Sequence, residues 1–145
     1  MKITHANTTV AAGGHEGPRN LRVSHARGIQ QADIVRAEYG EQWARGNIRN
    51  TITFEVTRIH DSLQAASRFV LDHAGTLPAT GLLVFAEVTP EGTTRRFIED
   101  AVLANVECIR QTGTTTEWAY VYLGGEILNR DPRTGRVGFG SVLPP

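Results

Sequence analysis

Residues 48–83 read IRNTITFEVTRIHDSLQAASRFVLDHAGTLPATGLL, and this stretch decides the fold because it contains a strand, a helix and the start of another strand in direct succession. In its first twelve residues apolar side chains alternate with polar ones, which is the period of a β-strand with one buried face. The apolar positions are Ile48, Ile52, Phe54 and Val56. We predict a half-buried strand, with Phe54 in the core beneath helix residues Phe69 and Val70.

The second part of this stretch has the pattern of a capped helix. Asp61 stands where an N-cap residue belongs, and Gln64 follows three residues later, as in a capping box. Gly75 and Pro78 are typical of a helix end. Between these signals apolar residues recur at helical spacing, at Leu63, Ala66, Phe69 and Val70. The pattern predicts one helix over about residues 62–75.

The residues after this helix predict strands joined by turns. Residues 81–88 are apolar on both faces, which is typical of a central strand, and a turn leads into a strand over 94–98. A second hairpin is predicted from strands over 101–110 and 117–123. In its last strand two sets share opposite faces, Trp118, Tyr120 and Tyr122 on one and Ala119, Val121 and Leu123 on the other. We therefore expect both faces to be covered.

The first third of the chain is the least regular. Short strands are predicted around Ile3, over residues 8–12 and from Leu21. Residues 28–46 are mostly polar, and within them residues 30–39 fit either a helix or a hairpin; we favour the hairpin.

A polar segment of this length without structure of its own usually binds something. Its large side chains, Tyr39, Trp43 and Arg45, belong to types that dominate interface hot spots. We predict that residues 28–46 contact a neighbouring identical subunit and that Trp43 and Arg45 anchor this contact. The alternative is that Trp43 closes the edge of its own core.

Composition excludes several classes of function. The 145 residues are enough for one domain, residues 1–145, and the 15 acidic and 15 basic residues balance, which argues against a nucleic-acid coat or a polybasic membrane contact. The single Cys108 rules out an internal disulfide and favours a reducing compartment. No run of residues has the length and apolarity of a signal peptide or membrane span. We expect a protein made and kept in a cytoplasm.

The chemically suggestive residues each fit a structural role. His60-Asp61-Ser62 has the residue types of a hydrolase triad, but neighbours in sequence cannot converge on one reacting atom. Cys108 lies on the apolar side of its strand, as a buried inert thiol would. The spaced histidines His5, His15 and His25 lack the close pairing on one element that metal ligands show. We expect no catalytic residue, cofactor or metal.

The order of elements predicts an α+β fold that is mainly β: an antiparallel β-sandwich or half-barrel with one packed α-helix and a long N-terminal hairpin or loop. In this layout the chain resembles the small structural proteins of long-tailed bacteriophages, meaning the tail-tube subunit and related tail-tip or baseplate ring proteins. The resemblance lies in the Trp43-Ala44-Arg45-Gly46-Asn47 approach to the strand over 50–58, the helix over 61–77, and the strands that end in Tyr120-Val121-Tyr122-Leu123-Gly124-Gly125.

This resemblance implies a non-enzymatic virion subunit that forms a ring, commonly a hexamer. Such rings stack into a tube, contact other tail proteins and let DNA pass without sequence-specific binding. The implied location is the virion tail, after assembly in the bacterial host cytoplasm. Two alternatives stay open: a cytoplasmic binding module that uses a sheet face, and an enzyme whose site is assembled from scattered residues, namely His25, Asp33, His60 and Asp72.

Overall fold

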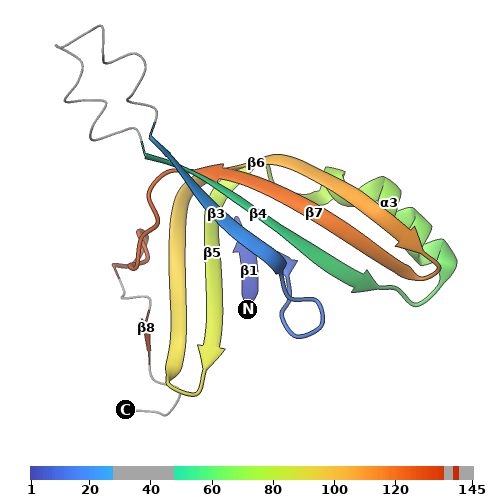
Figure 1. The fold of residues 1–145 in the computed structure, drawn as a ribbon, viewed down its shortest axis with the longest axis horizontal. Helices are drawn as coiled ribbons and strands as arrows, with labels where there is room; N and C mark the ends of the chain where they lie inside the picture. The colour runs from blue at the N-terminus through green and yellow to red at the C-terminus, as the bar shows by residue number, and fades with distance from the viewer. Residues whose placement is uncertain (28–47, 136–138, 141–145) are drawn as a thin grey trace, which may run out of the picture.

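A computed structural model describes residues 1–27, 48–135 and 139–140 of the chain. Over these residues the protein is mostly antiparallel β-sheet with one helix, so the predicted fold class is confirmed (Figure 1). The elements in chain order are β1 (Lys2–His5), β2 (Thr8–Ala11), β3 (Arg19–Arg27), β4 (Ile48–Ile59), α3 (Leu63–Thr76), β5 (Thr80–Thr89), β6 (Gly92–Thr112), β7 (Thr115–Gly124) and β8 (Phe139–Gly140).

The strands form one open sheet in the order β2-β1-β5-β6-β7-β4-β3, with β8 paired to the start of β6. Strand β6 is 21 residues long and belongs to two half-sheets. Its first part pairs with β5, which pairs with β1 and β2, and its second part pairs with β7, followed by β4 and β3. Figure 1 shows β6 changing direction between these partners, so that the two half-sheets cross steeply.

The prediction of separate strands over 94–98 and 101–110 is wrong, because both belong to β6. Between them Asp100 adopts a left-handed backbone conformation, with φ of 51°. A single residue of this kind bends a strand without ending its ladder. The bend is what lets one strand serve both half-sheets.

The core lies between the half-sheets. Ile3, Leu83 and Ile98 contribute from the first, and Phe54 and Tyr122 are among the buried residues of the second. The two layers approach closely where Gly124 lies on Ile98, since a Cβ on Gly124 would stand 2.4 Å from Ile98 Cγ2. The buried set also contains Val10, Ala11, Ile52, Val56, Phe85, Ala101, Trp118 and Tyr120. The predicted alternation of β4 is therefore confirmed at Ile52, Phe54 and Val56, while the side chain of Ile48 is outside the described set.

The outer face of the second half-sheet departs from the prediction that both faces are covered. Trp118, Tyr120 and Tyr122 are buried as expected, but Leu123 on the opposite face is 45% exposed. Ala119 and Val121 beside it are only partly buried. No element in the described part of the chain forms a layer over this face, and Leu123 on it is exposed.

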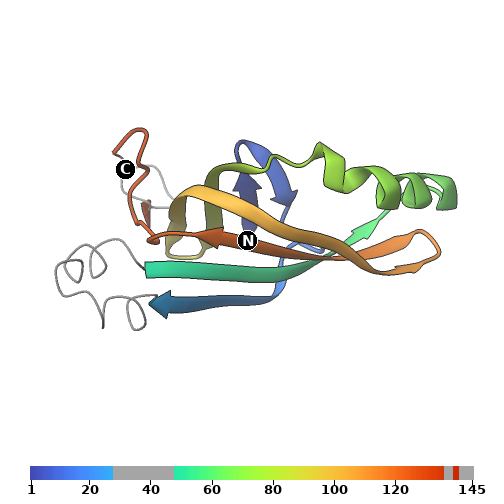
Figure 2. The ribbon, with the colours of Figure 1, turned by 90° about the horizontal axis from the view of Figure 1, so that it is seen from above.

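Helix α3 connects β4 to β5 and lies against the end of the second half-sheet (Figure 2). Its N-cap is Ser62, whose Oγ accepts a hydrogen bond from the Ala65 amide at 3.1 Å, so the prediction of Asp61 as N-cap is wrong. The helix continues through Gly75 and ends at Thr76, before Pro78. Leu63 at its start is 59% exposed rather than packed.

The helix does not cover Phe54 in the way the sequence predicts. The Phe54 ring stacks on Tyr120 and Tyr122, with centroids 5.2 and 6.0 Å away. Phe69 of the helix instead lies edge-on to Trp118, at 5.5 Å. The larger Trp118 ring, two residues along β7 from Tyr120, takes the place beneath the helix that we predicted for Phe54.

Candidate functional site

Three places in the molecule concentrate features that could serve function, and the first is the end of the β3–β4 hairpin. Arg27 and Ile48 are register partners across the two strands. Residues 28–47 lie between them in sequence. Twenty residues of sequence thus separate two strand positions that are paired with each other.

The second place is a group of polar side chains under helix α3, which we call the buried network: Arg58, His73 and Tyr120, with Glu16 at its outer end. Arg58 Nη2 donates to the Tyr120 hydroxyl at 3.0 Å and also to the Val10 carbonyl. His73 Nε2 lies 2.7 Å from the same hydroxyl. Because arginine can only donate, the Tyr120 oxygen accepts from Arg58, and with His73 in the Nδ1-protonated tautomer the Tyr120 proton is directed to His73 Nε2.

The buried network joins four segments of the chain. Arg58 comes from β4, Tyr120 from β7 and His73 from α3, while Val10 belongs to β2. The Arg58 guanidinium also lies 5.4 Å from the centre of the Phe69 ring and 3.5 Å from a Glu16 carboxylate oxygen. Glu16 is the part of this group nearest to solvent, with 29% of its side chain exposed against 13% for Arg58.

Ionisation of His73 and Tyr120 in the buried network is suppressed. Burial, reinforced by the positive charge of Arg58 and by the nearby His60, lowers the pKa of His73 to about 4. Burial also raises the pKa of Tyr120, although the neighbouring Arg58 acts in the opposite direction. His73 is thus neutral and Tyr120 is protonated near neutral pH, and Tyr120 is fully buried. The arrangement fits a hydrogen-bonded structural core better than a site that receives a substrate.

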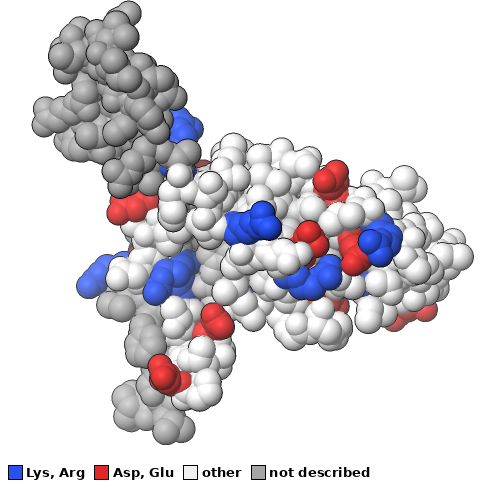
Figure 3. All heavy atoms as spheres, in the orientation of Figure 1, with Lys and Arg blue, Asp and Glu red and all other residues white. Residues whose placement is uncertain are grey.

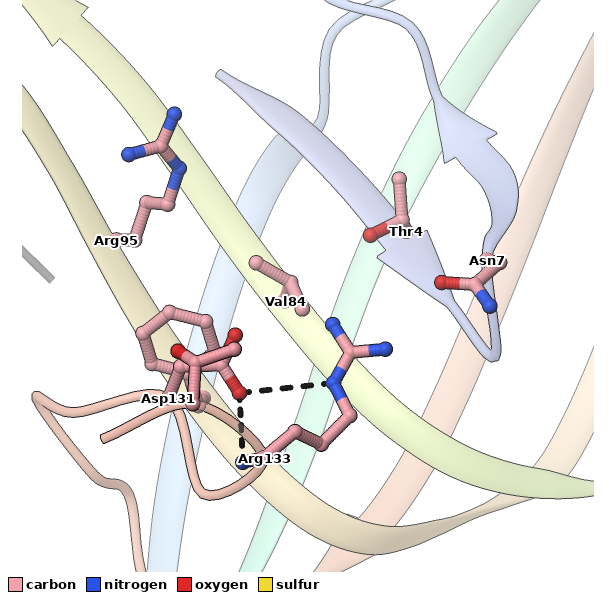
Figure 4. A pocket seen from close by; sticks show the side chains of 8 residues that line it. Thr4, Asn7, Val84, Arg95, Asp131 and Arg133 are labelled. Carbon is pink, nitrogen blue, oxygen red and sulfur yellow. Dashed lines mark hydrogen bonds and ion pairs between the residues drawn. The ribbon is translucent and has the colours of Figure 1, made fainter. Parts of the chain in front are cut away.

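The third place is a hollow on the outer face of the first half-sheet, beneath the segment that follows β7. We call it the C-terminal hollow; its volume is about 660 Å³. Figure 4 shows side chains from β1, β5, β6 and the turn around residue 132 directed toward it. Its lining residues are Thr4, Asn7, Val84, Arg95, Phe97, Asp131, Arg133 and Thr134.

The wall of this hollow is held by two sets of backbone contacts. Phe97 and Leu128 exchange both backbone hydrogen bonds, at 2.9 and 2.7 Å, which fixes the segment beside β6. The Asp131 carboxylate accepts from the Arg133 amide at 2.9 Å and lies 3.5 Å from Arg133 Nε. These hydrogen bonds, led by the backbone one, lower the pKa of Asp131. The turn thus holds the Arg133 side chain over the sheet.

The residues predicted as an interface are Tyr39, Trp43 and Arg45, and all three lie outside the described residues, as does the 28–46 segment to which they belong. Their predicted role stays a prediction.

The residues predicted for the alternative enzyme site do not lie close together in the described part of the chain. His25 pairs across to Asn50, whereas His60 follows the far end of β4, roughly 30 Å away along ten residues of strand. His60 contacts Thr116 Oγ1 at 2.8 Å, and Asp72 is exposed on α3. Asp33 lies outside the described residues.

The remaining histidines and the cysteine also lie apart from one another. His5 is fully buried, with Nε2 2.8 Å from the Ala101 carbonyl and its ring edge-on to Tyr122. His15 is exposed beside Glu16. Cys108 is partly exposed rather than buried, and its Sγ lies 3.5 Å from the Arg110 carbonyl. Within the described ranges no group of three or more ligating side chains could hold a metal ion.

Sequence reasoning missed both the buried network and the C-terminal hollow. A signal for the first was present, because Arg58 continues the core-facing phase of Ile52, Phe54 and Val56 along β4. A charged side chain in that phase must find partners inside. The hollow had no such signal, since it exists only where residues 128–134 fold back over β1, β5 and β6.

Comparisons with protein-family models, with curated proteins and with solved structures gave no match. Among the helical residues that the structure describes, none form a segment with the length and apolarity needed to cross a bilayer.

Proposed function

We propose that the protein is a non-enzymatic structural subunit that assembles with copies of itself into rings of a phage tail tube or tail tip. Residues 28–47 would bridge neighbouring subunits, in the same ring or the next, and Trp43 and Arg45 would anchor that bridge. The rings, hexameric in the resemblance noted above, would surround a channel through which DNA passes, and would contact other tail proteins.

The observation that carries this proposal is the pairing of Arg27 with Ile48. Two residues are enough to join paired strand ends in a hairpin. This chain has twenty residues between the paired strand ends, and some of their large side chains are of the types found in interface hot spots. A segment of this size, attached at one end of a hairpin, can reach a second molecule without altering the fold that carries it.

The open sheet gives independent support. Within the described residues β2 and β3 each pair on one side only, and β3 is nine residues long. Unpaired backbone groups on an edge strand can pair with another chain. When one surface of a subunit binds a different surface of the next identical subunit, the subunits close into a ring if the rotation between neighbours permits it.

The charge distribution is compatible with DNA in transit. On the face shown in Figure 3, basic and acidic side chains are interspersed over the described surface. The sequence as a whole is neutral. Tight binding of DNA requires many phosphate contacts from clustered Lys and Arg. A mixed surface favours passage over retention.

The test is to remove residues 28–47 and join Arg27 to Ile48 through Asn-Gly, the residues preferred in a two-residue turn. We expect the purified wild-type chain to form rings or tubes in negative-stain electron microscopy and a large species in light scattering. The shortened variant should keep the far-ultraviolet circular dichroism spectrum and unfolding transition of a folded domain, yet remain a monomer.

A double variant, Trp43→Ala with Arg45→Ala, tests the anchors without shortening the chain and should also be monomeric. Arg36→Ala is the matched control, since it removes one positive charge from the same segment and should assemble normally. A wild-type chain that stays monomeric at high concentration contradicts the proposal. Normal rings from the shortened variant would contradict the role given to residues 28–47.

A further inference from the structure

The C-terminal hollow has a floor whose residues follow from strand register. Thr4 on β1 and Phe97 on β6 both pair with Val84 on β5, so the three side chains form one row on the outer sheet face. The next row along the strands is Lys2, Ala86 and Arg95. Rows two residues apart share a face. The floor is thus apolar at Val84 and Phe97, with basic residues beside it.

The basic groups stand on two sides of this apolar floor. Figure 4 shows Arg133 reaching toward Thr4 and Asn7, with Val84 between its guanidinium and that of Arg95. Asn7 reaches the rim because the β1–β2 turn holds Ala6 and Asn7 in left-handed conformations, with φ of 49° and 68°. Polar donors from Thr4 and Asn7 therefore surround the Arg133 end.

The negative charge in the hollow does not neutralise both arginines. The Asp131 carboxylate is engaged by the amide and Nε of Arg133 in its own turn. In that contact Asp131 faces Nε, so the two terminal nitrogens of the Arg133 guanidinium can still donate to a ligand. Among the described residues the Arg95 side chain makes no hydrogen bond or ion pair. Two sets of guanidinium donors thus face a hollow with an apolar floor.

We propose that the C-terminal hollow binds a small, elongated ligand with a negatively charged group at each end and an apolar middle. Arg133, with Thr4 and Asn7, would hold one carboxylate, and Arg95 would hold the other. Val84 and Phe97 would lie under the middle of the ligand. The volume of about 660 Å³ is within the range of small-molecule sites.

Terephthalate is a suitable probe because it has two carboxylates across one aromatic ring, and benzoate is the same ring with one carboxylate. We would titrate each into the full-length chain at low ionic strength and follow the heat of binding by isothermal titration calorimetry, which works for monomers and assemblies alike. Terephthalate should give a saturable binding curve. Terephthalate should bind about tenfold more tightly than benzoate, the gain expected of a second charge-assisted contact.

Substitutions separate the two ends of the site. Arg95→Gln should reduce terephthalate binding to the level of benzoate, and Arg133→Gln should weaken both ligands. Arg96→Gln is the matched control, because Arg96 pairs with Phe85 on the opposite sheet face and its loss changes the net charge equally. It should leave both affinities unchanged.

Several results would overturn the proposal: no saturable binding of terephthalate, equal affinity for the two probes, or equal weakening by Arg95→Gln and Arg96→Gln. Circular dichroism of each variant confirms that it is folded before titration. Because binding is measured whether or not the chain assembles, this site can fail while the assembly role stands, and the reverse.

Discussion

The buried network and the C-terminal hollow are both built around arginine, but their arginines are used differently. Arg58 is 13% exposed, and its two terminal nitrogens contact Tyr120, the Val10 carbonyl and Glu16, while its buried Nε has no hydrogen-bond partner among the described residues. Arg133 is 58% exposed, and Arg95 has no side-chain partner in the described part of the chain. A guanidinium whose terminal nitrogens are bound to several partners inside the protein stabilises the fold, whereas one facing an open hollow is available to a ligand.

This difference predicts which property of the protein changes when each region is mutated. Changes in or beside the buried network should alter the free energy of unfolding, because they leave buried groups unpaired or create cavities. Changes in the C-terminal hollow should alter binding and leave stability nearly constant.

The largest effect is expected at Phe54, which stacks on Tyr120 in the layer beneath the network. Phe54→Ala should lower the free energy of unfolding by about 3 to 5 kcal/mol, because it removes a buried ring and leaves a cavity. Leu123→Ala on the open face of the same half-sheet is the control and should cost less than about 1 kcal/mol. Urea unfolding measures both, and equal losses would contradict the assignment of the two faces.

The next effect is a pH dependence that originates at His73. Its pKa is about 4 in the folded protein and has the ordinary histidine value of 6.5 in the unfolded chain, so between these pH values the unfolded chain binds more protons. Stability from this group is complete above pH 6.5 and should fall by about 2 to 3 kcal/mol as the pH drops to 4. Unfolding midpoints measured across this range test the slope.

His73→Phe should flatten this slope, since the buried imidazole is gone. His15→Gln, which removes an exposed histidine from the loop before β3, is the control and should retain it. A slope that survives in His73→Phe would show that other groups govern acid sensitivity.

A smaller loss is expected when one hydroxyl is removed from the network. Tyr120→Phe takes away the acceptor for Arg58 and the hydrogen-bond partner of His73, and should cost about 1 to 3 kcal/mol. Arg133→Gln in the hollow breaks only an exposed ion pair and should change stability by less than about 0.5 kcal/mol. If Arg133→Gln were the more destabilising variant in chemical denaturation, the contrast between the two regions would fail.

The same contrast explains what the sequence could predict. Local periodicity predicted the buried face of β4 and the existence of α3, because each depends on neighbours within a few residues. It did not predict that β6 continues through Asp100, since the two acidic residues Glu99 and Asp100 in succession are equally typical of a turn. Arg58 could have been suspected of burial from its phase, but its partners come from β2, β7 and α3. The C-terminal hollow depends on segments more than ninety residues apart in sequence, Thr4 and Arg133 among them, which no local pattern encodes.

The smallest predicted effect concerns the start of the helix that covers the network. Ser62 Oγ accepts from the Ala65 amide, one of the helix N–H groups that has no backbone partner, so Ser62→Ala should cost about 1 kcal/mol. Asp61 makes no such contact and is exposed, so Asp61→Ala should change stability by less than about 0.5 kcal/mol. The pair distinguishes the cap in the structure from the one the sequence predicted. A larger loss for Asp61→Ala than for Ser62→Ala in thermal unfolding would restore Asp61 as the cap and place the first turn of α3 one residue earlier.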